Sequence, residues 1–150
     1  MNNLKNNSPK KEEIVEDKKT VAKSKTTPGI IEVTDFKAEK SKILEKTAKE
    51  YFDSADEDFG KGRYNSAVVL YFKSLVALAD LFVLHETGDT PSSHNERFRI
   101  TQEQFQEVYE LLDKDFPFYQ NSYFQIMSKE LAEVIKNDAE IMAGKTKVKL

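Results

Sequence analysis

The sequence predicts an all-α protein, an antiparallel helical bundle of four to five helices that follows a disordered N-terminal tail. Three observations indicate this fold. Apolar residues recur at steps of three and four through most of the chain after residue 34, which is the spacing of one helix face. Glycines stand where helices are expected to end. Residues 66–83 are almost wholly apolar, and such a helix is stable only when other helices cover it on most sides.

Composition limits the chemistry that the chain can perform. It contains no cysteine, which excludes disulfides, thiolate nucleophiles and cysteine-bound zinc, and we expect no metal and no cofactor. The formal net charge is -3, and residues 1–28 hold seven lysines against four acidic residues, so a basic tail precedes a body of net charge -6. No uninterrupted apolar run reaches the length of a membrane span, and we expect a cytoplasmic protein that does not contact a membrane.

Three regions are expected along the chain. Residues 1–30 are predicted to be a disordered tail rich in lysine and asparagine, because they contain no aromatic and few large apolar side chains. This tail is either a solubilising leader or a lysine arm that contacts nucleic acid or a membrane surface. The helical domain is predicted over residues 34–144, and residues 145–150 form a basic end.

The first helix is expected to start at Thr34 or Asp35 and to end at Phe59, after a short extended segment at residues 29–33. Its inward face carries residues at helical spacing, namely Leu44, Ala48, Tyr51, Phe52, Ala55 and Phe59. Gly60 and Gly62 supply the flexible backbone of a tight connection. So short a loop predicts that the first two helices are antiparallel neighbours.

The second helix is expected to be capped by Asn65 or Ser66 and to end at Gly88. One narrow strip of small or polar residues interrupts its apolar surface, formed by Ser66, Lys73, Ala77 and Asp80. The segment 89–93 has the composition of a loop, and Ser92 or Ser93 is suited to cap a short helical piece that follows.

The second half of the chain is expected to hold two further helices and an aromatic segment. Residues 101–104, Thr-Gln-Glu-Gln, have the form of a capping box, which predicts a helix that starts there and ends near Lys114. Pro117, in the aromatic segment 116–124, suits the first turn of a helix. Ser128 is expected to cap the last helix, with inward-facing residues Leu131, Val134, Ile135 and Met142 and with Gly144 at its end.

The order of these elements resembles the HEPN superfamily of helical domains. The resemblance covers residues 45–143 and rests on helix-packing patterns: Ala48, Tyr51 and Ala55, the Gly62-Arg63-Tyr64 turn, Ala67, Tyr71, Lys73, Leu75 and Leu78, and the loop Thr90-Pro91-Ser92-Ser93-His94. The same turn also resembles one tetratricopeptide-like hairpin. A HEPN-like domain implies an interaction module that forms a homodimer or associates with a nucleotidyltransferase-type partner.

Many HEPN proteins are metal-independent ribonucleases, in which an arginine is followed by a histidine after four to six intervening residues. Neither histidine of this chain, His85 or His94, follows an arginine at that spacing, and His94 instead precedes Arg97. The resemblance therefore does not carry the nuclease role over. We expect a protein that is not an enzyme, and a ribonuclease that uses His94 is the least favoured alternative.

A candidate phosphate site lies after Pro91. A helix that starts at Ser92 or Ser93 presents free backbone amides to an anion, and His94, Arg97 and Arg99 follow directly. Together with Lys73 these residues form the candidate ligand-binding set, which would hold RNA or a nucleotide. The alternative is a capped helix start whose arginines pair with Glu96 or with the acidic helices.

Two further clusters permit more than one interpretation. Four acidic residues crowd the end of the first helix, Asp53, Asp56, Glu57 and Asp58; they form either a cation or partner site or a solvated face whose charge Lys61 and Arg63 offset. The aromatic residues between 109 and 124 could stack on bases, but a core or a dimer interface explains them better because few lysines or arginines flank them. The sequence therefore predicts a non-catalytic helical interaction module, with RNA or nucleotide binding as the alternative function.

Overall fold

The computed structural model describes the backbone of residues 30–150 and the side chains of residues 35–150. Over this part of the chain the structure contains five helices: α1 (Ile30–Gly60), α2 (Tyr64–Thr87), α3 (His94–Gln104), α4 (Gln106–Asn121) and α5 (Lys129–Thr146). The predicted all-α bundle is thereby confirmed. The tail predicted over residues 1–30 lies outside the described residues except for Ile30.

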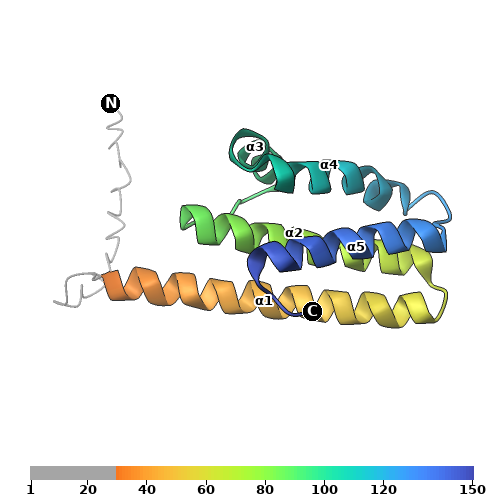
Figure 1. Ribbon diagram of the computed structural model, residues 1–150, viewed down its shortest axis with the longest axis horizontal. Helices are drawn as coiled ribbons and strands as arrows, with labels where there is room; N and C mark the ends of the chain where they lie inside the picture. Colours follow the sequence, from red (N-terminus) through yellow and green to blue (C-terminus); the bar gives the residue numbers. More distant parts are fainter. Residues whose placement is uncertain (1–29) are drawn as a thin grey trace, which may run out of the picture.

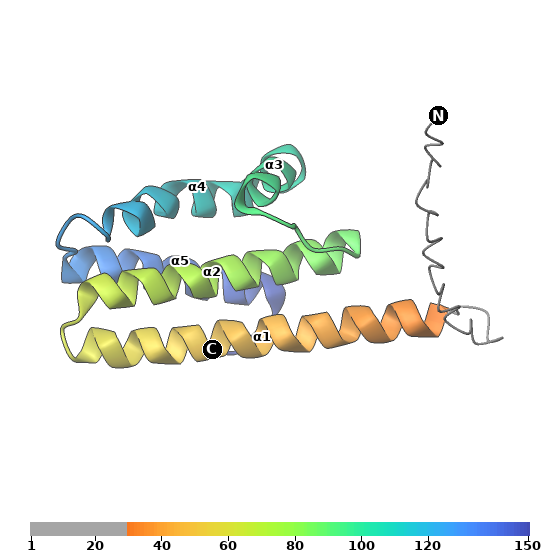
Figure 2. The same cartoon turned by 180° about the vertical axis from the view of Figure 1, so that it is seen from behind.

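Helix α2 occupies the centre of the bundle. It packs against α1, α5 and α4, and α3 packs mainly against α4. In Figure 1 and, from behind, in Figure 2, α1 runs along one side of the molecule, α3 and α4 lie on the other, and α2 and α5 lie between them. α1 and α2 are antiparallel neighbours as predicted, and Gly62 forms the turn with a φ of +72°, a conformation that favours glycine.

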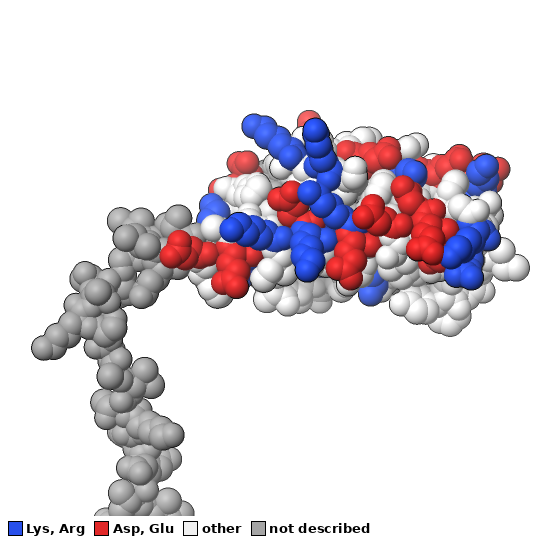
Figure 3. Space-filling view, turned by 90° about the horizontal axis from the view of Figure 1, so that it is seen from below, with Lys and Arg blue, Asp and Glu red and all other residues white. Residues whose placement is uncertain are grey.

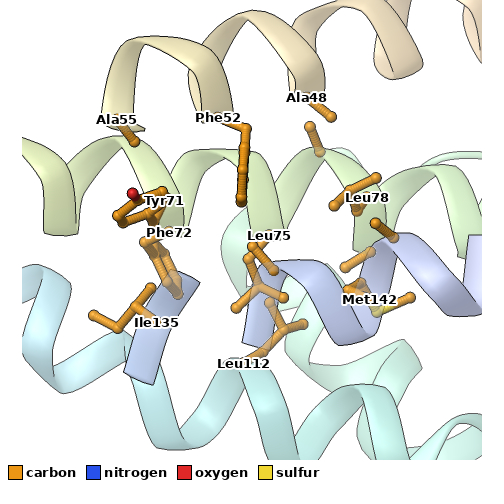
Figure 4. Packing of buried hydrophobic residues seen from close by; sticks show 14 of the residues in the cluster. Ala48, Phe52, Ala55, Tyr71, Phe72, Leu75, Leu78, Leu112, Ile135 and Met142 are labelled. Carbon is orange, nitrogen blue, oxygen red and sulfur yellow. The ribbon is translucent and has the colours of Figure 1, made fainter. Parts of the chain in front are cut away.

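The core is built on the apolar surface of α2. Side chains from four helices meet there (Figure 4), and the largest fully buried ones are Tyr71, Phe72, Leu75, Leu78, Leu81, Leu84, Leu112, Ile135, Met142, Val68, Val83 and Val108. By length and composition α2 could cross a membrane, but 72% of its most apolar 18-residue window is buried inside the bundle. The prediction that neighbouring helices cover this helix is correct.

The starts of α1 and α2 differ in detail from the expectation, whereas Gly88 ends α2 as predicted. The segment 30–33, expected to be extended, already belongs to α1, because β-branched residues only slightly disfavour a helix that continues from an adjacent turn. α2 starts at Tyr64 with Arg63 as its N-cap and has no side-chain cap. Neither Asn65 nor Ser66 is the cap, since Ser66 donates to Asp58 and Asn65 reaches a distant loop.

Asn65 holds the loop between α4 and α5. Its Nδ2 donates to the carbonyl oxygens of Ser122 and Gln125 at 2.8 and 2.7 Å, and its Oδ1 accepts from the backbone N–H of Met127 at 2.9 Å. Asn65→Ala is expected to destabilise the protein by about 1–3 kcal/mol, since it leaves these loop groups without partners. Urea unfolding and amide hydrogen exchange of residues 122–127 measure the effect, and Asn95→Ala, at an exposed position, should change neither.

The boundary between α3 and α4 lies four residues later than the capping-box pattern predicts. Thr101 is fully buried inside α3 and its hydroxyl donates to the carbonyl oxygen of Arg97 at 2.8 Å, so it continues α3 instead of opening a new helix. The break occurs at Phe105, whose ring packs edge-on against Phe82 with centroids 5.2 Å apart. Tertiary packing of Phe105 therefore outweighs the local capping signal.

Helices α4 and α5 are also longer than predicted. α4 does not end near Lys114 but continues through Pro117 to Asn121. Ser128 caps α5 as predicted, accepting from the N–H of Leu131. Gly144 does not end α5, which stops at Thr146 with Lys147 in the left-handed conformation at φ 58°. Val134, expected to face inward, has 41% of its surface exposed.

Candidate functional site

A hollow of about 270 Å³ opens on the face of α2 that carries the narrow polar strip. Four helices contribute to its lining. The lining residues are Leu44 and Tyr51 from α1, Phe72, Lys73, Val76, Ala77 and Asp80 from α2, His94 and Arg97 from α3, and Tyr119 from α4. The strip of small and polar residues in α2 thus forms the floor of a cleft between α1 and the α3–α4 pair.

A buried ion pair joins the floor of this cleft to α3. The Nε of Arg97 donates to one carboxylate oxygen of Asp80 at 2.6 Å, and its Nη2 donates to the other at 2.8 Å. Only 8% of either residue is exposed. A two-point guanidinium–carboxylate contact fixes direction as well as distance, so the pair sets how α3 lies on α2.

His94 lies at the rim of the cleft and is oriented by Arg97. The Nη1 of Arg97 lies 2.9 Å from the Nδ1 of His94, and because a guanidinium only donates, Nδ1 accepts and the ring proton resides on Nε2. Burial, with the Arg97 charge as a second cause, lowers the pKa of His94. The imidazole is therefore neutral at physiological pH and carries an N–H donor on Nε2.

Lys73 supplies the charge of the cleft. It is exposed, and its Nζ lies 5.8 Å from the centroid of the Tyr51 ring. The ion pairs found among residues 35–150 do not include Lys73. Since Asp80 and Arg97 neutralise each other and His94 is neutral, Lys73 gives the cleft a net positive charge of one.

Aromatic rings also line the hollow. The Tyr119 ring stacks on Phe72 with centroids 4.8 Å apart, and its hydroxyl lies 3.4 Å from that of Tyr123. This contact, and burial after it, raise the pKa of Tyr119, so the phenol stays protonated at neutral pH. The lining therefore combines flat apolar surfaces with a small number of polar groups, as ligand pockets do.

A second hollow continues the cleft along α1. It measures about 230 Å³ and is lined by Lys40, Ile43, Leu44, Asp80, Thr90 and Pro91, so it shares Leu44 and Asp80 with the first hollow. The Nζ of Lys40 lies 3.4 Å from the Thr90 hydroxyl and 3.9 Å from a carboxylate oxygen of Asp89. The positive charge of Lys40, at this end of the cleft, is therefore already engaged by Thr90 and Asp89.

The structure brings three of the four predicted ligand residues together. Lys73, His94 and Arg97 line the same hollow. Arg99 does not line it and instead forms an exposed ion pair with Glu103 at 3.1 Å. The alternative interpretation, in which the arginines pair with acidic residues, therefore describes Arg99 fully. It describes Arg97 in part, because Arg97 pairs with Asp80 and also lines the hollow.

The start of α3 is occupied by its own side chains. Ser93 accepts from the N–H of Glu96 at 3.1 Å, and the backbone N–H of Ser92 donates to the Glu96 carboxylate at 2.8 Å. The Ser92 hydroxyl also donates to this carboxylate, and the two contacts from Ser92, the hydroxyl first and the backbone N–H second, lower the pKa of Glu96. Side chains thus already occupy two of the backbone N–H groups at this helix start, those of Ser92 and Glu96, and the cleft floor is the stronger candidate.

Three of the four acidic residues at the end of α1 are paired with cations. Asp56 contacts Lys136 at 2.8 Å and accepts from the Tyr71 hydroxyl at 2.5 Å. Ion pairs also join Glu57 to Lys61 and Asp58 to Arg63. Within the described residues, no group of three or more histidine or acidic side chains is arranged to hold a metal ion. The pairing supports the interpretation of this cluster as a charge-compensated face.

Sequence reasoning did not identify Tyr51, Asp80 or Tyr119 as site residues. Tyr51 follows the apolar periodicity of the first helix, which predicts a core position, and Tyr119 belongs to the aromatic stretch that a core or a dimer interface explains better than base stacking. Asp80 did carry a signal, because a lone acid in an apolar helix requires a buried partner. No protein-family model matches the sequence, and no curated protein matches it either.

Proposed function

We propose that this protein is a non-catalytic binding domain whose cleft on α2 takes a small ligand that combines a flat ring with an anionic group, the chemistry of a mononucleotide. One observation carries the proposal: Lys73, His94 and Arg97, from two helices, converge on a hollow that Tyr51 and Tyr119 also line. Cationic and aromatic groups lie within one ligand-sized space.

The anionic group is assigned to Lys73 and His94. The Lys73 ammonium forms no ion pair with an acidic side chain of residues 35–150, and the Nε2–H of His94 is a second donor at the same hollow. Arg97 is a positioning residue: it gives one N–H to His94 and two to Asp80. A charge-assisted contact to phosphate is shorter and stronger than a neutral hydrogen bond.

The ring of the ligand is assigned to the aromatic lining. Aromatic rings stack on or meet edge-on with flat ligands, and Tyr51 and Tyr119 offer such faces. A hollow of about 270 Å³ lies at the small end of ligand pockets, which favours a mononucleotide over a polymer. The α1 face of the molecule also carries intermixed acidic and basic side chains (Figure 3), so a nucleic-acid strand would meet charges of both signs there.

The bonding of Arg97 supports a role other than catalysis. A ribonuclease scheme needs an arginine free to grip phosphate, whereas Arg97 gives Nε and Nη2 to Asp80. The resemblance to HEPN domains, the nucleotidyltransferase-type partner and the cytoplasmic location remain predictions. The nucleotide proposal depends on none of them.

Titration calorimetry with nucleoside monophosphates tests the proposal. We expect nucleoside monophosphates to bind more tightly than the corresponding nucleosides or inorganic phosphate. Lys73→Ala is expected to weaken binding about tenfold or more, because it removes the charge that contacts the phosphate. Arg99→Ala is the matched control, since it removes a nearby cation that lies outside the cleft, and it should leave the affinity unchanged.

Two results would contradict the nucleotide proposal. The first is the absence of nucleoside monophosphate binding at millimolar concentration. The second is an equal effect of Lys73→Ala and Arg99→Ala, which would show a general electrostatic attraction. Single-stranded RNA that binds more tightly than any mononucleotide, with a steep dependence on salt, would instead favour the RNA-binding alternative.

A further inference from the structure

Large apolar side chains are exposed along α5 and at both of its ends. On the helix, Val134 and Ile141 are 41% and 50% exposed. In the loop before it, Phe124 and Ile126 are 90% and 96% exposed, and Leu150 beyond its end is 37% exposed. These five account for more than half of the eight exposed large apolar residues in the described part of the chain. Such a concentration on one element marks an interaction surface.

The exposed face of α5 has the spacing of a helix-pairing seam. Val134, Asn137, Ile141 and Gly144 follow one another at steps of three, four and three, the heptad pattern of paired helices, and all four are exposed. The opposite face of α5 packs inside the bundle through Ala132, Ile135, Asp138, Ala139, Met142, Ala143 and Thr146. Nothing lies within 4 Å of the position of a Cβ at Gly144, so another helix can approach closely there.

The charges beside this seam are self-complementary. Glu133 lies next to Val134 in the first half of α5, and Lys147 lies at its C-terminal end; both are exposed. They are fourteen positions apart and so fall at the same edge of a heptad seam. When two copies of α5 run antiparallel, Glu133 of each copy faces Lys147 of the other. A parallel arrangement would leave Glu133 and Lys147 at opposite ends of the pair, so these charges favour the antiparallel direction.

We propose that α5 is the interface of a homodimer, in which two copies pair antiparallel across a two-fold axis near Ala139 and Glu140. Val134 of each copy packs beside Gly144 of the other, and Asn137 beside Ile141. This is an isologous contact, in which the same surface patch serves both subunits. The inference does not depend on the nucleotide proposal, because α5 contributes no residue to the lining of the cleft.

The α4–α5 loop extends the same interface. An antiparallel pairing places the loop of one copy over the C-terminal end of α5 of the other, where Leu150 is exposed. Asn65 fixes the loop backbone with three hydrogen bonds, so Phe124 and Ile126 are held outward before association. A loop that is already ordered loses less conformational entropy on binding.

Light scattering across a concentration series tests the interface. The full chain is expected to dimerise, and Ile141→Glu or Val134→Glu should each raise the dimer dissociation constant at least about tenfold by placing a charge in the seam. Ile43→Glu, at a position on α1 that is 57% exposed, is the control and should leave the dimer intact. Circular dichroism shows whether each variant is folded; these positions are exposed, and we expect unchanged spectra.

A charge exchange tests the antiparallel direction. Glu133→Lys and Lys147→Glu are each expected to weaken the dimer about fivefold, and the chain that carries both changes should regain the wild-type dissociation constant. Glu140 of one subunit faces Glu140 of the other at the two-fold axis, where the like charges repel. Glu140→Gln should therefore lower the dimer dissociation constant. A monomeric wild type, a dimer that Ile141→Glu and Val134→Glu leave unchanged, or a failure of the double variant to regain affinity would overturn the proposal. A monomer that binds lipid vesicles through Phe124 would assign the surface to a membrane and would also overturn it.

Discussion

Asp80→Ala is expected to destabilise the protein by about 3–5 kcal/mol, because it leaves the Arg97 guanidinium buried without a counter-charge. Arg97 is only 8% exposed, so water cannot replace the carboxylate. The midpoint of thermal unfolding should fall by more than about 10 °C for a domain of this size. Calorimetry and urea unfolding measure the two quantities.

The double variant and an exposed ion pair provide the controls for this prediction. Removing both partners, with Asp80→Leu and Arg97→Met together, should return the stability to within about 2 kcal/mol of the wild type, since no charge is then left buried. Glu103→Ala breaks the exposed pair with Arg99, whose side chains are 56% and 58% exposed, and should cost less than about 0.5 kcal/mol. A loss below about 1 kcal/mol in Asp80→Ala would contradict the structural role of the pair.

The same variants connect the fold to the candidate site. Arg97 orients the His94 ring through Nδ1, so the double variant keeps α3 packed but frees the imidazole. We therefore expect this variant to remain folded and to bind nucleoside monophosphates more weakly. A double variant that keeps its stability but loses affinity would show that Arg97 positions His94 in addition to holding α3.

The helix faces could be predicted from the sequence because they depend on local periodicity. Ala48, Phe52 and Ala55 are buried on α1 as their spacing indicates, and the near-total burial of α2 follows from its lack of a wide polar face. The boundary at Phe105 could not be predicted in the same way. Thr101 carries a valid capping signal, and only the packing of Phe105 on Phe82, far apart in sequence, decides against it.

The candidate site was predictable only where it depends on a local sequence pattern. Clustered cations near a helix start indicated His94 and Arg97, but the sequence did not show that Asp80 lies beside them. Arg99 belongs to the predicted set but does not line the hollow, because residues two apart on a helix point to different sides. Its separation from Arg97 could therefore have been foreseen. Tyr51 follows the core periodicity and Tyr119 belongs to the aromatic segment, and only the structure shows that both border a cleft.

The protein is expected to lose stability as the pH rises from about 4 to about 8, because of one buried acid between α4 and α5. Asp115 is fully buried, and neither of its carboxylate oxygens has a hydrogen-bond donor among the described residues. Burial, with the nearby Asp138 charge as a second cause, raises the pKa of Asp115 to about 8. Lys114 forms an ion pair with the Asp138 carboxylate at 2.5 Å. A proton on Asp115 can then be donated to Asp138.

The sign of the effect follows from proton binding. Between pH 4 and pH 8 the folded protein holds a proton on Asp115 that the unfolded chain, with an aspartate pKa near 3.9, has released. The free energy of unfolding therefore falls by up to about 1.4 kcal/mol per pH unit in this window. The stabilisation that this proton supplies is complete below the pKa of Asp115 in the unfolded chain. It is lost as the pH rises past the pKa of Asp115 in the folded protein. Urea unfolding at several pH values measures the slope.

Asp115→Asn is expected to flatten this dependence, because an amide fills the same space without a titrating proton and can donate to Asp138 at every pH. Near pH 8 the variant should be more stable than the wild type by roughly 2–4 kcal/mol, whereas near pH 4 the two should be similar. Asp113→Asn removes an exposed acid of the same helix and should leave the slope unchanged. Equal slopes of the unfolding free energy against pH in the wild type and Asp115→Asn would show that Asp115 is ionised in the folded protein. The carboxyl groups of Asp115 and Asp138 would then require a different compensating charge.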